Sequence, residues 1–159
     1  MVEVNEKLYV SAEAFFTQLA ESVAYDVCEA TGKKIRPKQL HKGYSYHKKL
    51  KNKVGRKGDV KVVITEFSIP TSYCAEFHSY GGVNKLGYHI EKIDTDCIGV
   101  TYMEDFIGNT KMANMNFRIM NAIYKNRAKK KARRMLRAME TYIKENGNKV
   151  GTATKESVK

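Results

Sequence analysis

The sequence has no tryptophan, only two prolines and three cysteines, and no long uninterrupted hydrophobic run. A membrane-spanning helix needs about 18 consecutive apolar residues, and no segment supplies them. An odd number of scattered cysteines without a C-x-x-C pair argues against a disulfide framework and against the usual zinc sites. The first ten residues include Glu3 and Glu6, which is typical of neither a signal peptide nor a transit peptide. We therefore expect a cytoplasmic protein with reduced thiols.

Motifs of enzymatic chemistry are missing as well. The chain contains no G-x-S-x-G, H-E-x-x-H, P-loop or G-x-G-x-x-G sequence. The polar, outer faces of strands are the expected place of three of the four histidines, His47, His78 and His89. Glu104 and Asp105 are expected to follow the last strand. We therefore expect no catalytic residue, no metal site and no cofactor, although an inward position of Glu104, His78 or His89 would favour an enzyme.

Positive charge is in excess, with a net charge of +12, and much of it lies in one segment. Between Lys125 and Arg137 there are eight basic residues and no acidic one. One interpretation is an ordinary solvated helix face, and the other is a surface that binds an acidic protein or a nucleic acid. Without a helix-turn-helix, zinc finger or RNP-like motif, nucleic-acid contacts would go to phosphates. The residues predicted to bind an anionic partner are Lys129, Lys130, Arg133 and Arg134.

The N-terminal part predicts a strand followed by a helix. Alternating apolar residues indicate an edge strand within residues 2–10. Ser11 is a suitable N-cap, and apolar residues at three- and four-residue spacing predict an amphipathic helix over residues 12–30. Gly32 is the expected C-cap residue.

Residues 42–108 change to a period of two and predict a five-stranded antiparallel meander with one apolar face. Turn residues separate the runs, including a turn expected at residues 81–84. That turn would place Phe77 opposite Tyr88 and Glu76 near His89 on the outer face.

A long helix is predicted over residues 111–145, followed by a flexible polar tail at 147–159, so that residues 1–146 form one domain. One face of the helix is apolar along its basic half and is expected to cover the sheet. The first half carries a second apolar face that either lies under the loops near Phe106 and Ile107 as a cavity lid or mediates a homodimer. The predicted interface residues are Met112, Met115, Ile119 and Ile123.

Particular stretches of the chain resemble a known superfamily. They are LYVSAEAFF at residues 8–16, SVAYDVCEATGKKIRPKQL at 22–40, GYSYHKKL at 43–50, VKVVITEF at 60–67, YHIE at 88–91 and KKKARRMLRAMETYI at 129–143. With the predicted order of elements, they are similar to the START-like (SRPBCC, helix-grip) superfamily, and within it to an uncharacterised bacterial family with a domain of unknown function. The resemblance implies an α+β fold in which a curved antiparallel sheet of about six strands wraps a long C-terminal helix and encloses a cavity. It transfers no catalytic or ligand-binding residue.

Three functions are compatible with the sequence. The leading hypothesis is noncatalytic binding of a small amphipathic or hydrophobic molecule between the sheet and the C-terminal helix. The second is an interaction module that uses the basic helix, and the third is an enzyme of the cyclase or hydrolase kind. Buried tyrosine hydroxyls need partners, so several inward tyrosines suggest a partly polar interior. The residues predicted to line the cavity are Tyr44, Tyr46, Val62, Phe77, Tyr88, Tyr102, Phe117 and Tyr124.

Overall fold

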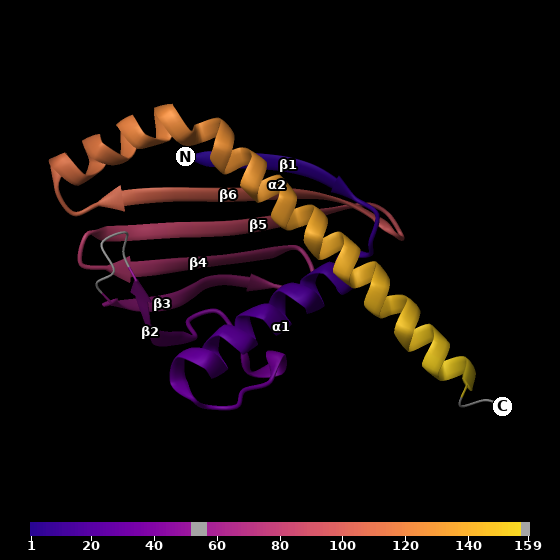
Figure 1. Ribbon diagram of the computed structural model, residues 1–159. Coiled ribbons are helices and arrows are strands. Elements are labelled where there is room, and N and C mark those ends of the chain that lie inside the picture. The colour runs from indigo at the N-terminus through magenta and orange to yellow at the C-terminus, as the bar shows by residue number, and fades with distance from the viewer. Residues whose placement is uncertain (52–56, 157–159) are drawn as a thin grey trace.

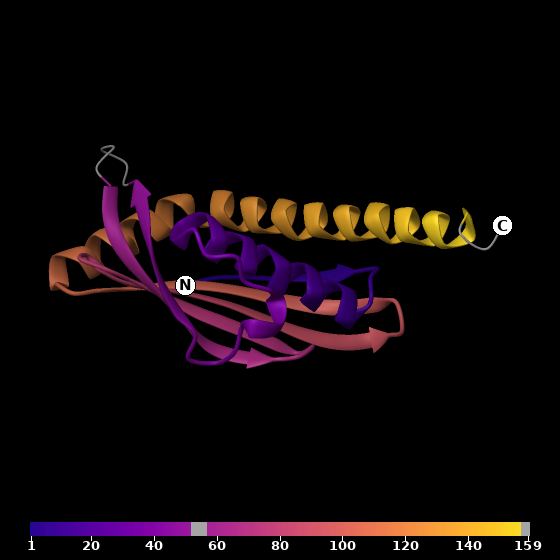
Figure 2. The same ribbon diagram turned by 90° about the horizontal axis from the view of Figure 1, so that it is seen from below.

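The computed structural model shows one six-stranded antiparallel sheet with both long helices on the same face (Figures 1 and 2). The strands are β1 (Val2–Leu8), β2 (Ser45–Lys51), β3 (Lys57–Ser68), β4 (Ser72–Ser79), β5 (Gly82–Asp94) and β6 (Cys97–Gly108), in the order β1-β6-β5-β4-β3-β2. The helices are α1 (Ala12–Thr31), a short 3-10 helix η1 (Pro37–Gln39) and α2 (Lys111–Glu156). The structure describes residues 1–51 and 57–156, without the side chains of residues 51, 57, 113, 117, 121 and 147–156. The expected α+β architecture, an antiparallel sheet of six strands with a long C-terminal helix, is confirmed.

Local signals place the first two elements where the sequence predicts them. β1 is an edge strand that pairs with β6. The Ser11 hydroxyl accepts a hydrogen bond from the Ala14 amide at 3.1 Å, which satisfies one of the free N–H groups at the start of α1. Gly32 ends the helix in the left-handed conformation, with φ of 72°.

The hairpin between β4 and β5 has a different register from the predicted one. Ser79 pairs with Gly82, so the turn lies at Tyr80 and Gly81, and Phe77 stands opposite Asn84. Gly82 fixes this position, because its φ is 151° and a Cβ there would lie 2.3 Å from the Ile107 carbonyl oxygen. The predicted turn at residues 81–84 is therefore wrong by two residues.

Two other predicted cross-strand pairs change with this register. Tyr73, not Phe77, lies opposite Tyr88. Glu76 contacts His78 at 2.9 Å and Lys85 at 3.4 Å, and His89 lies opposite Ser72. Both corrections follow from the tighter turn, since a two-residue change in the turn displaces the pairing partner along β5 by four positions.

β6 is longer than predicted. The sequence places Glu104 and Asp105 after the last strand, but pairing with β5 continues to Gly108. Asp105 stands opposite Lys85, an opposite-charge pair that favours continuation of the ladder. Glu104 consequently belongs to a strand, and its side chain takes the face opposite to that of Asp105.

Four aromatic rings cross the concave face of the sheet in one row, which we call the aromatic row: Phe67, Tyr73, Tyr88 and Tyr102. Neighbouring ring centroids lie 5.2 to 6.4 Å apart in tilted or edge-on arrangements. Phe15 of α1 packs on Tyr88 at 6.2 Å, and Phe16 packs on Phe67 at 5.2 Å. The row thus joins the sheet to α1 in the middle of the core.

We call residues 111–127 the first half of α2 and residues 128–145 its second half, and the second half packs on the sheet. Ala132 and Leu136 are buried against the core, and Ala128, Met135, Met139 and Ile143 pack around it, as the predicted helix face requires. The Glu140 carboxylate accepts a hydrogen bond from the Tyr9 amide at 2.7 Å and ties the helix to the end of β1. The helix continues to Glu156, beyond the predicted end at residue 145. The domain boundary at residue 146 stays a prediction.

Candidate functional site

The concave face carries most of the residues predicted to line a cavity. Tyr46 lies opposite Val62, and Val62 lies opposite Phe77, so these three side chains share this face across β2, β3 and β4. Tyr88 and Tyr102 are opposite one another on β5 and β6. Four of these are buried and Phe77 is partly buried.

The remaining three predicted lining residues are placed differently. Tyr44 is partly buried and packs against Tyr46, with ring centroids 6.4 Å apart. Tyr124 on α2 is 46% exposed. The side chain of Phe117 lies outside the described residues. The sheet therefore brings together the strand residues of the predicted set, while Tyr124, the member on α2 whose side chain is described, is largely exposed.

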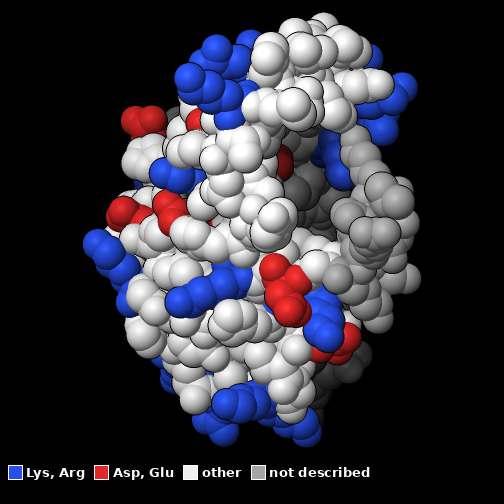
Figure 3. Space-filling model, turned by 90° about the vertical axis from the view of Figure 1, so that its left-hand side faces the viewer, with Lys and Arg blue, Asp and Glu red and all other residues white. Residues whose placement is uncertain are grey.

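Burial changes along the concave face. From the aromatic row toward α1 the inward side chains are buried, among them Ile90 and Val100. On the other side of the row burial is mixed: Phe77, Leu86 and Glu104 are only partly buried, whereas Ile64 and Ala75 beside them are buried. Figure 3, which views this end of the sheet, shows a hollow beneath the start of α2, with acidic and basic surface on its walls. The accessible end of the concave face is the candidate binding site.

A polar cluster lies on this accessible end. Glu104 is opposite Leu86 and Val2, on the same face as Tyr102. The Tyr102 hydroxyl donates to one Glu104 carboxylate oxygen at 3.0 Å, and the Asn84 side-chain amide donates to the other at 3.4 Å. The sequence analysis missed Asn84, and it placed Glu104 beyond the strand. The alternation of Val100, Tyr102 and Glu104 would have indicated its inward position.

The tyrosines of the site are held in the neutral form. Burial raises the pKa of Tyr88 and of Tyr102 well above its usual value, and the negative charge of Glu104 raises both further. The Tyr88 hydroxyl faces the Met135 sulfur at 3.7 Å, a weak acceptor. These hydroxyls therefore act as hydrogen-bond donors at physiological pH.

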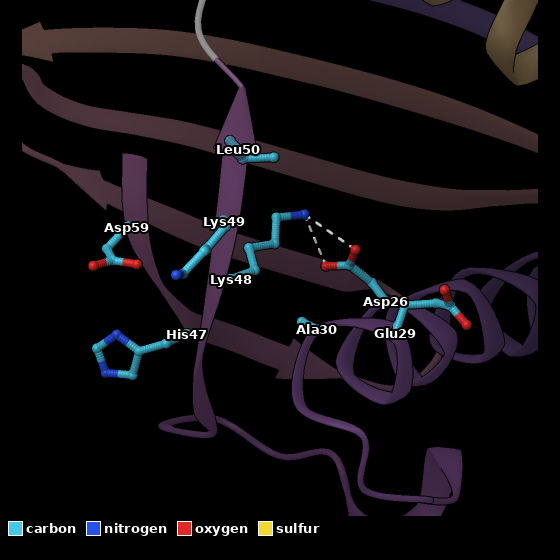
Figure 4. A pocket seen from close by; sticks show the side chains of 8 residues that line it. All are labelled: Asp26, Glu29, Ala30, His47, Lys48, Lys49, Leu50 and Asp59. Atoms are coloured by element: carbon cyan, nitrogen blue, oxygen red, sulfur yellow. Dashed lines mark hydrogen bonds and ion pairs between the residues drawn. The ribbon is translucent and has the colours of Figure 1, made fainter. Parts of the chain in front are cut away.

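A second polar group closes the opposite edge, where α1 meets β2 (Figure 4). Asp26 accepts hydrogen bonds from the Tyr46 hydroxyl at 2.5 Å and from the Lys48 ammonium at 2.9 Å. Burial raises the pKa of Tyr46 strongly, and the bond to Asp26 adds to the effect. A pocket of about 460 Å³ lies beside this pair between α1 and β2. Because Asp26 and Lys48 neutralise one another, the group mainly fastens the edge strand to α1.

The outer side of α2 combines cationic and apolar surface. Of the predicted anion-binding residues, Lys130 and Arg134 point away from the core and share a depression of about 490 Å³ with Arg127 and Lys131. Arg133 instead pairs with Glu6 at 3.2 Å. Lys129 is partly buried. The predicted interface residues are exposed, at 70% for Met112, 58% for Met115, 54% for Ile119 and 67% for Ile123.

The described part of the chain contains neither a cluster of metal-ligating side chains nor a membrane-spanning helix, and its strand histidines lie outside the candidate site. His47, His78 and His89 are exposed on the outer face of the sheet. Across residues 1–51 and 57–156, no three His, Cys, Asp or Glu side chains among those described come together as a metal site would require. Within the same residues, no helix has the length and apolar character needed to cross a bilayer.

Comparisons with known proteins agree with this geometry. The family model described as "Domain of unknown function (DUF3284)" matches residues 2–125. A conserved protein from Geobacillus kaustophilus superimposes with a TM-score of 0.56 at 15% identity, over 89% of this chain and 93% of that one. A START superfamily protein from Mycobacterium smegmatis gives 0.53 at 9% identity, over 91% and 97%. Ara h 8.0201 gives 0.51 at 11% identity, over 90% and 96%. No curated protein matches the chain.

Proposed function

The chain belongs to the DUF3284 family and has a START-like fold, and from this premise we propose that it binds a small amphipathic molecule between the sheet and α2 without transforming it. The observation that supports this most is the accessible end of the concave face. There, the partly buried apolar side chains Phe77 and Leu86 share the concave face with the hydrogen-bonding cluster of Glu104, at the end of the sheet where Figure 3 shows a hollow. Ligand sites are typically concave and mostly apolar, with a few polar groups that fix orientation.

The proposed binding mode follows the gradient of burial. The apolar part of the ligand lies on Phe77, Leu86 and the edges of Tyr88 and Tyr102. The polar part meets Glu104, which is the charged side chain of the cluster. The aromatic row limits how deep the ligand reaches, because beyond it the core is filled by residues of α1 and of the second half of α2.

The test fills the hollow with a side chain. Leu86→Trp places a large ring on the concave face, whereas Lys85→Trp places the same ring on the outer face of the same strand. We expect Nile red, a neutral dye that fluoresces in apolar surroundings, to bind the wild type and the Lys85→Trp variant. Leu86→Trp should weaken dye binding at least tenfold at unchanged thermal stability. Equal dye binding by all three proteins would contradict the proposal.

A catalytic role is the second candidate, because Glu104 does point inward. In a cyclase- or hydrolase-like reaction it would serve as the general base, with the Tyr102 hydroxyl as a hydrogen-bond donor. The histidines lie on the other face of the sheet and do not contribute. Native mass spectrometry distinguishes the two functions: a carrier releases one compound from both proteins, in a smaller amount from Glu104→Gln, while an enzyme accumulates a different compound in Glu104→Gln from the one in wild type.

Binding of an anionic macromolecule is the third candidate, and the outward cations of α2 favour it. We expect the affinity for duplex DNA or polyglutamate to fall steeply with salt. Replacing Lys130, Lys131 and Arg134 by glutamine should abolish it. The control removes the same charge from exposed lysines elsewhere, Lys38, Lys61 and Lys85. Equal effects of the two triple variants would show that net charge, not this face, causes binding.

A further inference from the structure

Glu104 differs from the other inward carboxylates by having no cationic partner among the described side chains. Asp26 pairs with Lys48 at 2.9 Å. Glu6 pairs with Arg133 at 3.2 Å and with Arg137 at 2.7 Å. Within the described residues, the donors to Glu104 are the neutral groups of Tyr102 and Asn84. Among the side chains that the structure describes, Glu104 is therefore a carboxylate of the concave face without an ion pair.

The Glu104 carboxylate also has unused hydrogen-bonding capacity. Two carboxylate oxygens provide about four acceptor positions. The Tyr102 hydroxyl fills one, and the Asn84 amide fills another at the long distance of 3.4 Å. A carboxylate that is partly removed from water gains most from a charged donor. A ligand in the hollow is positioned to supply that donor.

The side chains around Glu104 suit a cation with an apolar body. Tyr102 contacts Glu104 directly, and its ring packs on Tyr88 at 5.2 Å. Aromatic faces attract cationic nitrogen atoms, and on this same concave face the Lys48 ammonium lies 5.5 Å from the centre of the Phe77 ring. Leu86, opposite Glu104, offers an aliphatic surface.

From this arrangement, and resting on the proposed function, we infer that the ligand is a cationic amphiphile, an alkyl or aryl amine whose protonated nitrogen binds Glu104. The Glu104 carboxylate and the Tyr102 ring receive the nitrogen, and Leu86 and Phe77 receive the apolar part. A fatty acid would place its carboxylate against Glu104 and is disfavoured by like-charge repulsion. The long-range field opposes this preference, because the net charge of +12 repels cations from the protein. A measured preference for amines must therefore come from the site.

The experiment compares three eight-carbon competitors that differ in their polar end. Octylammonium, 1-octanol and octanoate are titrated at pH 7 against Nile red bound to the full chain, at concentrations below micelle formation. A charge-assisted hydrogen bond in a partly desolvated site corresponds to roughly a 10- to 100-fold gain in affinity. We expect octylammonium to displace the dye at a concentration at least tenfold lower than octanol, and octanoate to be the weakest.

Two variants with the same loss of charge locate the preference. Glu104→Gln keeps the shape of the side chain and should retain Nile red while octylammonium and octanol become equivalent. Asp105→Asn removes the adjacent carboxylate on the outer face of β6 and should keep the wild-type order. A preference for octylammonium that survives in Glu104→Gln would overturn the inference.

The outcomes separate the inference from the proposed function. If Nile red binds and the three competitors are equivalent, or octanoate is the strongest, the amine preference is wrong and the ligand cavity stands. If Nile red does not bind, calorimetric titration with octylammonium decides. Binding that is lost in Glu104→Gln supports the site at Glu104, and no binding overturns both the inference and the cavity.

Discussion

The two halves of α2 belong to one continuous helix and have comparable apolar content, but they are buried to very different extents. In the second half Leu136 is fully buried and Ala132 nearly so. In the first half Met112 and Ile123 remain 70% and 67% exposed. Figure 1 shows that the helix changes direction between these parts, and that the second half crosses the sheet toward α1.

The difference reflects what lies beneath each half. Under the second half the concave face is apolar and closed by α1, so a helix gains free energy by packing on it. The first half begins just after β6, above the hollow that Figure 3 shows, and a helix packed closely on Glu104 would remove its carboxylate from water. One half therefore stabilises the fold, and the other leaves surface available for binding.

The largest expected effect is a loss of stability at alkaline pH, caused by the buried tyrosines on the concave face of the sheet. Burial raises the pKa of Tyr46, Tyr73, Tyr88 and Tyr102. In the unfolded chain tyrosines ionise near pH 10, so above that pH the folded state retains protons that the unfolded state has lost. The free energy of unfolding should then fall as pH rises, by on the order of 5 kcal/mol at pH 11 for the four together. Urea unfolding at pH 9, 10 and 11 measures this.

Single phenylalanine variants assign the alkaline effect. Tyr73→Phe removes one titrating group and should reduce the loss of stability between pH 9 and 11 by about a quarter. Tyr80→Phe should leave it unchanged, because Tyr80 is fully exposed in the folded state as it is in the unfolded one. The same alkaline loss in Tyr73→Phe as in the wild type would contradict the assignment.

The next largest effect is a difference in stability between alanine variants in the two halves of α2. Leu136→Ala leaves a cavity between α2 and the sheet and should lower the free energy of unfolding by about 3 kcal/mol. Met115→Ala removes a side chain that is already 58% exposed and should change it by less than about 0.5 kcal/mol. Urea denaturation at neutral pH measures both. Similar losses in the two variants would mean that the first half of the helix packs as tightly as the second.

Much of this fold could be predicted from the sequence because its signals are local. Ser11 and Gly32 mark the ends of α1, and the two-residue alternation gives the strands and their inward faces. The resemblance of the quoted stretches to START-like proteins supplied the architecture. The helix ends and the strand alternation each depend on a few neighbouring residues, and the structure confirms them together with the architecture.

What could not be predicted depends on contacts distant in the sequence. The β4–β5 turn is fixed at Tyr80 and Gly81 by the close approach of Ile107 to Gly82, a contact across the sheet. The length of β6 depends on pairing with β5, which continues to Gly108. An apolar face on the first half of α2 was recognised, but periodicity does not reveal whether the sheet beneath offers a surface to pack on.

The smallest effect on stability concerns the exposed half of α2 and its predicted homodimer. Large exposed apolar patches are uncommon on monomers, and Met112, Met115, Ile119 and Ile123 are exposed at three- and four-residue spacing along one side of the helix. We expect a dimer at micromolar concentration in light scattering. Ile119→Glu should shift it to monomer while changing the free energy of unfolding of the monomer by less than about 0.5 kcal/mol.

The basic residues beside this surface predict how the dimer responds to salt. Lys111, Arg118 and Lys125 would approach their counterparts in a second copy, so salt that screens their repulsion should strengthen the dimer. Tyr142→Glu introduces the same charge at an exposed position of the second half and should leave the dimer intact. A monomer at all salt concentrations would exclude a second copy as the partner of this surface. The first half of α2 would then face solvent and any ligand in the hollow beneath it. Substitution of its apolar residues would change ligand binding and leave the oligomeric state unchanged.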